Sequence, residues 1–264
     1  MHKIAFQLGP LPIHWYGVFV ALGFGLGLWN ASRRALKANI SPDSVWDSGL
    51  WIIIGTIVGA RLLYVITYWK QDLADKPWTE IFMVHHGGLV FYGGLIGAIL
   101  TTLIYLLVKK LPVWKFGDVM APGIALGYAI GRIGCLMNGC CYGKETSVPW
   151  AIHFPADHET HGVGVHPTQI YETLLNIPLY FFLAWLFRRR KFDGQVFATY
   201  LMGYAVLRSF VEFFRGDYPV LHGGWATQAH LISFAIFAAG AILFFALRGS
   251  GSGEPRAKPT HERA

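Results

Sequence analysis

The sequence predicts an all-α integral membrane protein with seven transmembrane helices. Of its 264 residues, 54% are hydrophobic and only 14% are charged, whereas soluble domains average about 25% charged residues. The mean hydropathy is +0.41. Seven apolar stretches of about 17–24 residues alternate with short polar loops, and this is the length that crosses the hydrocarbon core as a helix. Composition and segment length therefore give the same fold class.

The apolar stretches set the limits of the expected helices. Their ranges are 15–32, 47–69, 88–108, 118–137, 170–187, 195–214 and 230–247. Glycines recur within them, as at Gly23, Gly25 and Gly27, and small residues allow membrane helices to approach closely. We expect residues 1–247 to form one seven-helix transmembrane domain that carries an external loop at 138–169. Residues 248–264, rich in Gly, Ser, Pro and charge, are expected to form a disordered tail.

The loops differ in basic charge, which predicts the orientation. One alternating set carries fourteen Lys and Arg residues, within 33–37, 109–115, 188–191 and 248–263, and the other set carries five. Because cytoplasmic loops are enriched in Lys and Arg, the N-terminus is predicted to be periplasmic and the C-terminus cytoplasmic. The net charge of +7 resides in these short loops, with no basic and aromatic platform for nucleic acid. We therefore expect no nucleic-acid partner.

Three arginines lie inside apolar stretches and are candidates for a site. They are Arg61, Arg132 and Arg208, and Glu212 follows Arg208 by one helical turn. A guanidinium in hydrocarbon costs from about 2.5 to over 10 kcal/mol, so such residues usually face the protein interior and serve a function. Guanidinium groups suit the bidentate binding of phosphate or carboxylate. This pattern indicates an enzyme that handles a phospholipid head group.

With the predicted orientation, the polar groups inside the spans gather in the outer half of the membrane. The contributing segments are His14-Trp15-Tyr16, Arg61 with Tyr64, residues 85–94, Arg132 to Asn138, residues 166–172, and Arg208 with Glu212 and Arg215. Only Asp118 lies at the cytoplasmic end of a span. The segregation predicts a site that opens toward the outer side of the membrane.

Most of these features also have a structural interpretation. His14-Trp15-Tyr16 can be an interfacial aromatic anchor, and Arg208 with Glu212 can be an ion pair that closes the bundle. The glycine pairs 87–88 and 93–94 can serve helix packing, or can let a head group approach bare backbone at a helix start. Pro167 and Thr168 can simply begin and cap a helix. The sequence leaves these alternatives open.

The three cysteines, Cys135, Cys140 and Cys141, form a separate cluster. Their C-x4-C-C spacing matches none of the usual zinc ligand patterns, so we expect neither a metal nor a cofactor. The cysteines can be small packed thiols, or can have a redox or metal-binding role. The sequence does not decide between these alternatives.

The order of the motifs resembles a known family. These motifs are His14-Trp15-Tyr16-Gly17, Gly87-Gly88, Gly93-Gly94-Leu95-Ile96-Gly97, Gly131-Arg132-Ile133-Gly134, Asn138-Gly139, His166 to Glu172, and Arg208 with Val211 to Arg215. The chain resembles the prolipoprotein diacylglyceryl transferases, which are integral membrane enzymes of bacteria. The resemblance covers nearly the whole chain and implies seven helices with a site toward the outer leaflet of the inner membrane.

The resemblance implies a reaction and roles for the polar residues. The diacylglyceryl group of phosphatidylglycerol moves to the lipobox cysteine in the signal peptide of a preprolipoprotein, and glycerol phosphate leaves. Arg132 would grip the head group, Arg208 would stabilise the leaving phosphate or the incoming thiolate, and Glu212 would orient Arg208. The other residues of the predicted binding set are Tyr16, Arg61, Gly93, Gly94, Asn138, His166 and Arg215. Phosphatidylglycerol, preprolipoproteins and membrane lipids are the implied partners.

The chain departs from the family pattern at several positions. The usual histidine before the second glycine pair, a candidate base for the acceptor thiol, is Tyr92 here, which we place among the catalytic candidates. A phenol is a poor base near neutral pH because it titrates at about pH 10. Substitutes are His85, His86 or His166, or no side-chain base at all. The usual asparagine and acid of the central motif are Cys135 and Cys140, and a glutamine near the last span is replaced by His230.

These departures keep two other functions open. One is a divergent paralog that moves the lipid group to another acceptor. The other is a non-catalytic membrane protein that binds lipid or senses thiols. A transporter is less compatible with the sequence, because no repeated halves are evident and the polar residues do not extend across the bilayer.

Overall fold

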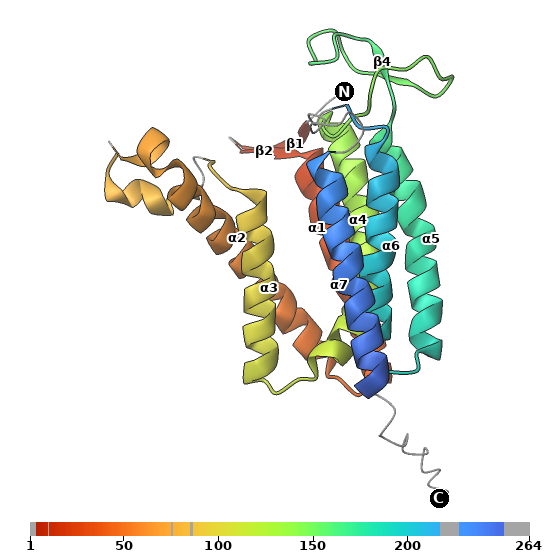
Figure 1. The fold of residues 1–264 in the computed structure, drawn as a ribbon. Helices are drawn as coiled ribbons and strands as arrows, with labels where there is room; N and C mark the ends of the chain where they lie inside the picture. The colour runs from red at the N-terminus through yellow and green to blue at the C-terminus, as the bar shows by residue number, and fades with distance from the viewer. Residues whose placement is uncertain (1–3, 10, 75, 85–86, 217–226, 251–264) are drawn as a thin grey trace, which may run out of the picture. The chain divides into compact units, whose positions relative to one another are not determined.

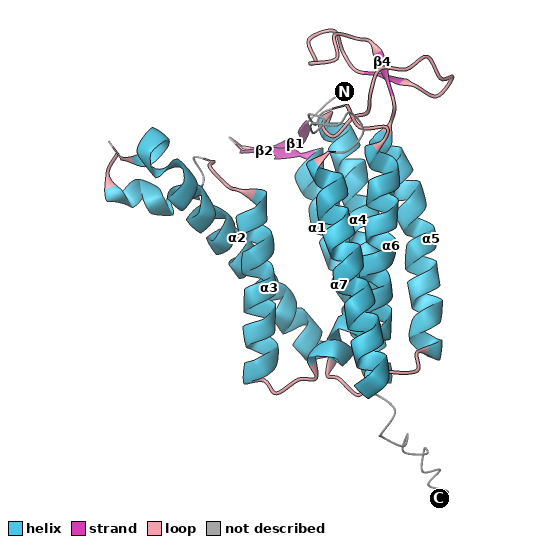
Figure 2. Cartoon of the chain, viewed as in Figure 1, coloured by secondary structure: helices cyan, strands magenta, loops and turns pink. Residues whose placement is uncertain are grey.

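The computed structural model describes residues 4–9, 11–74, 76–84, 87–216 and 227–250. Seven α-helices of at least 18 residues occur in these ranges, together with short strands and other helical turns (Figures 1 and 2). The helices are α1 (Trp15–Ala35), α2 (Pro42–Tyr68), α3 (Phe91–Val108), α4 (Val113–Asn138), α5 (Thr168–Arg189), α6 (Gln195–Glu212) and α7 (Gln228–Ser250). Each overlaps one of the seven predicted ranges. The all-α membrane fold class is therefore confirmed.

Five of the seven helices are long and apolar enough to cross a membrane on their own composition. They are α2 with its short continuation to Leu73, α3, α4, α5 and α7. Helices α1 and α6 have the length, 21 and 18 residues, but are not among the five. Helix α7 continues to Ser250, three residues beyond its predicted end. The predicted disordered tail otherwise falls on residues 251–264, outside the described ranges.

The chain divides into two compact units, one of residues 1–27 and 117–264 and the other of residues 28–116. The predicted site residues are distributed between them. Arg61, Tyr92, Gly93 and Gly94 belong to the smaller unit, and the other predicted residues belong to the larger one.

In the smaller unit, α2 and α3 pack through glycines. Gly55 and Gly59 on α2 face Gly93 and Gly97 on α3, and a methyl group at any of these positions would overlap a backbone carbonyl of the opposite helix. The amide of Val90 donates a hydrogen bond of 3.1 Å to the carbonyl of Ala60 where α3 begins. Membrane helices gain stability from this close approach, because lipid provides no hydrophobic drive for helix association. The packing role of the glycine pair 93–94 is thus established.

In the larger unit, α1 and α4 approach each other in the same way. A methyl group at Gly23 would lie 2.7 Å from the carbonyl oxygen of Gly127, and one at Gly27 would lie 2.8 Å from that of Gly123. Both distances are shorter than van der Waals contact, so any side chain would separate the two backbones. This packing fixes α4, which carries Arg132, against α1.

Asp118 has a structural function that explains its position apart from the other polar residues. Its fully buried carboxylate accepts hydrogen bonds of 2.8–2.9 Å from the amides of Gly194, Val196 and Phe197. These amides begin α6 and have no partners within that helix. Arg190 lies 3.7 Å from the same carboxylate. Asp118 on α4 therefore holds the start of α6.

Two small antiparallel sheets flank the helices of the larger unit, and the sequence did not predict them. Strand β1 (Ile4–Leu8) pairs with β2 (Leu11–His14), and β3 (Ile152–His153) pairs with β4 (Gly164–Val165). His14 ends β2, and α1 begins at Trp15, as predicted. Isolated bridges join Gly143 to Arg215 and Glu145 to Val165. The loop after α4 is therefore an ordered cap (Figure 1).

Candidate functional site

Arg132 on α4 and Glu172 on α5 form the first half of a charged network. The Arg132 Nε and a carboxylate oxygen of Glu172 are in direct ion-pair contact. The Arg132 Nη2 donates to the hydroxyl of Tyr128 at 2.5 Å, and that hydroxyl donates to the same Glu172 oxygen at 2.7 Å. Tyr128 and Arg132 are one helical turn apart on α4, so both reach Glu172 from the same face. The three side chains close a ring of polar contacts.

Arg208 and Glu212 on α6 form the second half. The Arg208 Nη1 donates to Glu212 at 2.5 Å and lies 3.9 Å from the other oxygen of Glu172. The remaining oxygen of Glu212 accepts a hydrogen bond of 2.6 Å from the hydroxyl of Thr227, just before α7. Glu172 thus links two arginines from different helices, and three helices and the residue before α7 contribute to one charged cluster.

Solvent exposure differs between the two charge types in the cluster. The side chains of Glu172 and Glu212 are 3% and 0% exposed, whereas those of Arg132 and Arg208 are 14% and 12% exposed. The carboxylates are therefore behind the guanidiniums. A buried guanidinium needs such a partner, because an unpaired buried charge is strongly unfavourable. The exposed part of the cluster therefore belongs mainly to the two arginine side chains, and guanidinium groups suit an anion.

The segment 139–141 is folded back onto the end of α4. Gly139 has φ +76°, and the amide of Cys140 donates to the carbonyl of Cys135 at 3.1 Å. A glycine in the left-handed region with this hydrogen bond is a Schellman ending of a helix. Cys141 follows with φ +64°, which is unfavourable for a residue with a side chain. The chain therefore reverses direction directly after Asn138.

Two buried residues at the start of α5 hold this reversed segment. The Thr168 hydroxyl donates to the carbonyl of Cys141 at 2.6 Å, and the Gln169 side-chain amide donates to that of Cys140 at 2.7 Å. Both side chains are almost completely buried. Thr168 does not cap its own helix, so the helix-cap interpretation of this motif is wrong. The His166-Pro167-Thr168-Gln169 motif instead positions the cysteine segment.

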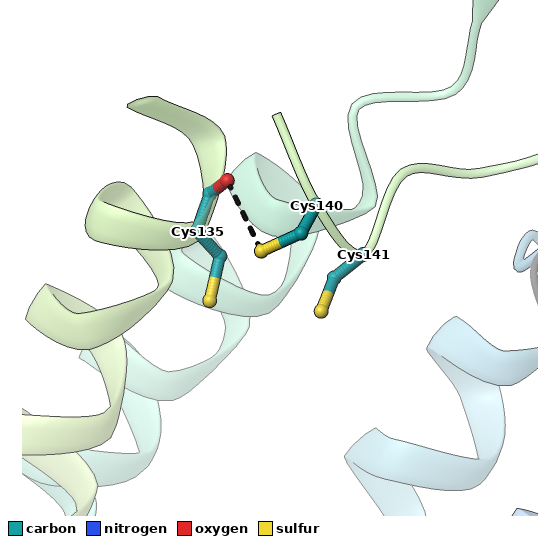
Figure 3. A group of neighbouring side chains, drawn as sticks. All are labelled: Cys135, Cys140 and Cys141. Carbon is teal, nitrogen blue, oxygen red and sulfur yellow. Dashed lines mark hydrogen bonds between the residues drawn. The ribbon is translucent and has the colours of Figure 1, made fainter. Parts of the chain in front are cut away.

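The three cysteine side chains point toward one another as a result (Figure 3). All three are free thiols of intermediate exposure, and their sulfur atoms all lie within 4.8 Å of one another. Hydrogen bonds from the Cys135 and Cys140 thiols lower the pKa of the Cys141 thiol. The positive charges of Arg132 and Arg215 lower that pKa further. The cysteine cluster is thus electrostatically connected to the arginine site.

Four other predicted residues of the larger unit surround these two clusters. Tyr16, at the start of α1, is 45% exposed, and Asn138 is the last residue of α4, two residues before Cys140. His166 Nδ1 lies 3.0 Å from the hydroxyl of Tyr171. Arg215 is 5% exposed. The structure therefore places most of the predicted residues of the larger unit in or near the charged cluster and the cysteine cluster.

In the smaller unit, Arg61 is engaged by backbone carbonyls. Its guanidinium donates to the carbonyls of Glu80, Ile81, Gly87 and Gly88 at 2.5–3.2 Å, and its side chain is buried. These contacts fasten the segment before α3 to α2. Arg61 therefore has a structural role that competes with its predicted contact to the lipid head group.

Tyr92 lies in the first turn of α3 and is 54% exposed. Its ring packs edge-on against Phe91, with the ring centroids 5.7 Å apart. Much of its side chain is therefore uncovered by the rest of the protein. The alternative bases His85 and His86 lie outside the residues that the structure describes.

A shallow, open apolar groove with a volume of about 490 Å³ lies along α5, α6 and α7 in the larger unit. Its lining residues are Leu175, Pro178, Leu179, Phe182, Thr199, Met202, Gly203, Val206, Leu207 and Phe237. Leu207 directly precedes Arg208, and Leu175 lies one helical turn after Glu172. The apolar groove and the charged cluster are thus carried by neighbouring residues of the same two helices, α5 and α6.

Comparison with known proteins identifies the family. The family model described as prolipoprotein diacylglyceryl transferase matches residues 3–246. The chain belongs to this family. It is 40% identical over 244 residues to the phosphatidylglycerol–prolipoprotein diacylglyceryl transferase of Finegoldia magna, covering 92% of this chain and 94% of that protein. The proteins of the same name from Synechococcus elongatus and Bacillus cytotoxicus are 35% and 34% identical, over 89% and 97% of this chain and 84% and 96% of theirs.

In this member of the diacylglyceryl transferase family, two residues of the charged cluster were not predicted from the sequence. Glu172 was part of a motif but had no assigned role, and Tyr128 was not considered. Two sequence features could have indicated these residues, namely the helical spacing of Tyr128 and the apolar surroundings of Glu172. Tyr128 precedes Arg132 by four residues, and Glu172 is an acid near the start of an apolar helix with no basic residue one turn away. A buried acid in that setting needs a cation from another helix.

Proposed function

We propose that this protein transfers the diacylglyceryl group of phosphatidylglycerol to the lipobox cysteine of a preprolipoprotein and releases glycerol phosphate. It would act as a multi-pass protein of the bacterial inner membrane. Family membership supports the reaction class, and the relatives' names carry both substrates. One alternating set of loops has an excess of Lys and Arg, which predicts that these loops are cytoplasmic. That orientation supports a site that faces the periplasm.

The arginine pair that is backed by buried carboxylates carries the proposal. Arg132 and Arg208 come from different helices and share Glu172, so their positions are fixed before a ligand arrives. A phosphodiester would bind to the accessible N–H groups. Donors that are fixed in advance stabilise developing charge effectively, because they need no reorganisation during the reaction.

The two arginines would act on the bond between the glycerol carbon and the phosphate oxygen. The sulfur of the acceptor thiolate attacks the glycerol carbon of the diacylglyceryl group, and the bond from that carbon to the phosphate oxygen breaks. The phosphate oxygen takes the electron pair and gains negative charge, which Arg208 would neutralise, while Arg132 would hold the head group. Glu212 keeps Arg208 in place through their contact at 2.5 Å. The apolar groove along α5 and α6 suits an acyl chain of the donor.

Glycerol phosphate release tests the proposal. Purified protein would receive phosphatidylglycerol and a synthetic lipobox peptide, with a serine peptide as the parallel reaction. We expect release only with the cysteine peptide, and no detectable turnover in R132A and R208A. Losing one such donor typically costs about 3–4 kcal/mol of barrier, or about 10²–10³ in rate. R188A, at the end of α5 away from the cluster, is the matched control and should keep full activity.

A second function has a specific observation in its favour. Cys135 and Cys140 occupy positions where the family pattern has an asparagine and an acid, and this keeps a different acceptor possible. Release of glycerol phosphate with an acceptor other than the cysteine peptide would support it. Full activity of R132A or R208A would contradict the phosphate assignment for either acceptor.

A further inference from the structure

The three cysteines have the geometry of an incomplete metal site. Their sulfur atoms lie within 4.8 Å of one another. In a tetrahedral zinc site with bonds of about 2.3 Å, the sulfur atoms are about 3.8 Å apart. Side-chain rotation that brings the sulfurs together by about 1 Å or less would therefore suffice for all three to bind one ion. Thiolate ligands select soft ions such as Zn²⁺.

The backbone around the cysteines is already fixed for such binding. The helix ending at Gly139 turns Cys140 back toward Cys135, and Thr168 and Gln169 hold the two carbonyls of the reversed segment. Cys141 keeps a left-handed conformation, with φ +64°, which costs roughly 1–2 kcal/mol for a residue with a side chain. Such local strain persists where surrounding contacts determine the conformation.

Charge and access also fit an ion with an open position. Arg215 acts electrostatically on Cys141, so a positive charge lies near the thiolates that would bind the ion. All three cysteines are partly exposed. Zinc sites with three protein ligands keep the fourth position for water or substrate, whereas structural sites are closed by four ligands. Among the described residues, only these three form a cluster with metal-binding spacing.

We propose that Cys135, Cys140 and Cys141 bind one Zn²⁺ ion whose fourth position takes the acceptor thiol. This inference rests on the proposed function for the identity of the acceptor, and it assigns the activation of the thiol to the ion. The thiol binds zinc as a thiolate and releases its proton to water, since a coordinated thiol is deprotonated. Its sulfur then attacks the glycerol carbon, and the electron pair of the broken carbon–oxygen bond stays on the phosphate. No side-chain base is needed, which accounts for Tyr92 at the histidine position.

Direct metal binding is the first test. Full-length protein, purified under reducing conditions, would be titrated with Zn²⁺ against a chromophoric chelator. We expect one ion per chain, and a loss of affinity of at least about tenfold in each of C135A, C140A and C141A. H161A removes an exposed potential ligand from the same external loop and should bind zinc as the unchanged protein does. Thermal unfolding of each variant separates lost ligands from lost folding.

Cobalt replaces zinc as the probe of the fourth position. Co²⁺ bound by the three cysteines should show thiolate charge-transfer absorption, and the lipobox cysteine peptide should raise it by about one third, from three thiolates to four. The serine peptide should leave it unchanged. These readouts do not require turnover. Metal binding with the peptide response but no glycerol phosphate release would support this site and contradict the proposed transferase.

Three results would overturn the metal proposal. The first is no zinc binding above that of the triple alanine variant. The second is a cobalt spectrum that the cysteine peptide does not change. The third is full transfer activity in zinc-free protein, which would leave the transferase function intact. An intact mass that is lower by two hydrogens before reduction, in protein that binds no metal after reduction, would indicate a disulfide between two of the cysteines in place of the metal site.

Discussion

Glu172 is the residue on which the charged cluster depends. It contacts Arg132 directly, accepts from Tyr128 and lies 3.9 Å from Arg208, with a side chain that is 3% exposed. Arg132 and Arg208 would repel each other without a carboxylate between them. Glu212 cannot replace it, because its two oxygens are used by Arg208 and Thr227. Glu172 is therefore the acid that links the two arginines, while Glu212 holds Arg208 from its own helix.

The substitution E172Q tests this role. We expect at least a tenfold fall in kcat, because the amide keeps the shape but not the charge that fixes two guanidiniums. Removing one partner of a buried ion pair also costs about 3–5 kcal/mol of stability, so thermal unfolding must accompany the kinetics. Y128F removes a single neutral hydrogen bond and should cost only about 0.5–1.5 kcal/mol. Unchanged kcat in folded E172Q would mean that the arginines are positioned by other contacts.

At the scale of elements, glycine contacts determine how closely the helices pack. Gly59 on α2 lies against Gly93 and Gly97 on α3, and α1 meets α4 through Gly23 and Gly27. The sequence predicted glycine-mediated packing in general but not the partners, because several glycine spacings were available on each helix. The partners became visible only with the rotation of each helix about its axis.

The substitution G59A tests the packing of α2 on α3. The added methyl group would overlap the carbonyl of Gly93 and lie 2.9 Å from the Cα of Gly97, so the two backbones must separate. Overpacking of this kind typically costs 1–3 kcal/mol. The matched control is G25A in α1, where a methyl group meets no atom within 4 Å. Thermal unfolding in lipid nanodiscs should show a lower midpoint for G59A only. Equal midpoints would show that the contact between α2 and α3 is easily adjusted.

At the scale of the whole molecule, the helices were predictable because the membrane constrains them. Every backbone polar group in hydrocarbon must be paired within the segment, so long apolar stretches had to be helices, and all seven are. The charged cluster was only partly predictable. Arg132, Arg208 and Glu212 stood out as charges in apolar surroundings, whereas the role of Glu172 depends on three helices meeting. The cysteine cluster was hidden because C-x4-C-C spacing does not reveal the chain reversal at Gly139.

The number of crossings is the prediction that belongs to the whole molecule. Five helices are apolar enough to cross alone, and we expect α1 and α6 to cross as well because their neighbours cover their polar positions. Glu212 on α6, for example, is buried against Thr227 and Arg208. Seven crossings with basic loops inside place the N-terminus in the periplasm and the C-terminus in the cytoplasm. An even number of crossings would put both termini on the same side.

Reporter fusions at the C-terminus and cysteine labelling near the N-terminus measure this directly. A fluorescent protein that folds only in the cytoplasm should be bright when fused after Ser250, and an alkaline phosphatase that is active only in the periplasm should be inactive there. A single cysteine introduced near residue 5, in a variant with the three native cysteines replaced, should react with a thiol reagent that does not cross the membrane. One introduced at position 191, between α5 and α6, should be protected. Labelling at position 191 in intact cells would contradict the seven-crossing topology and the periplasmic site.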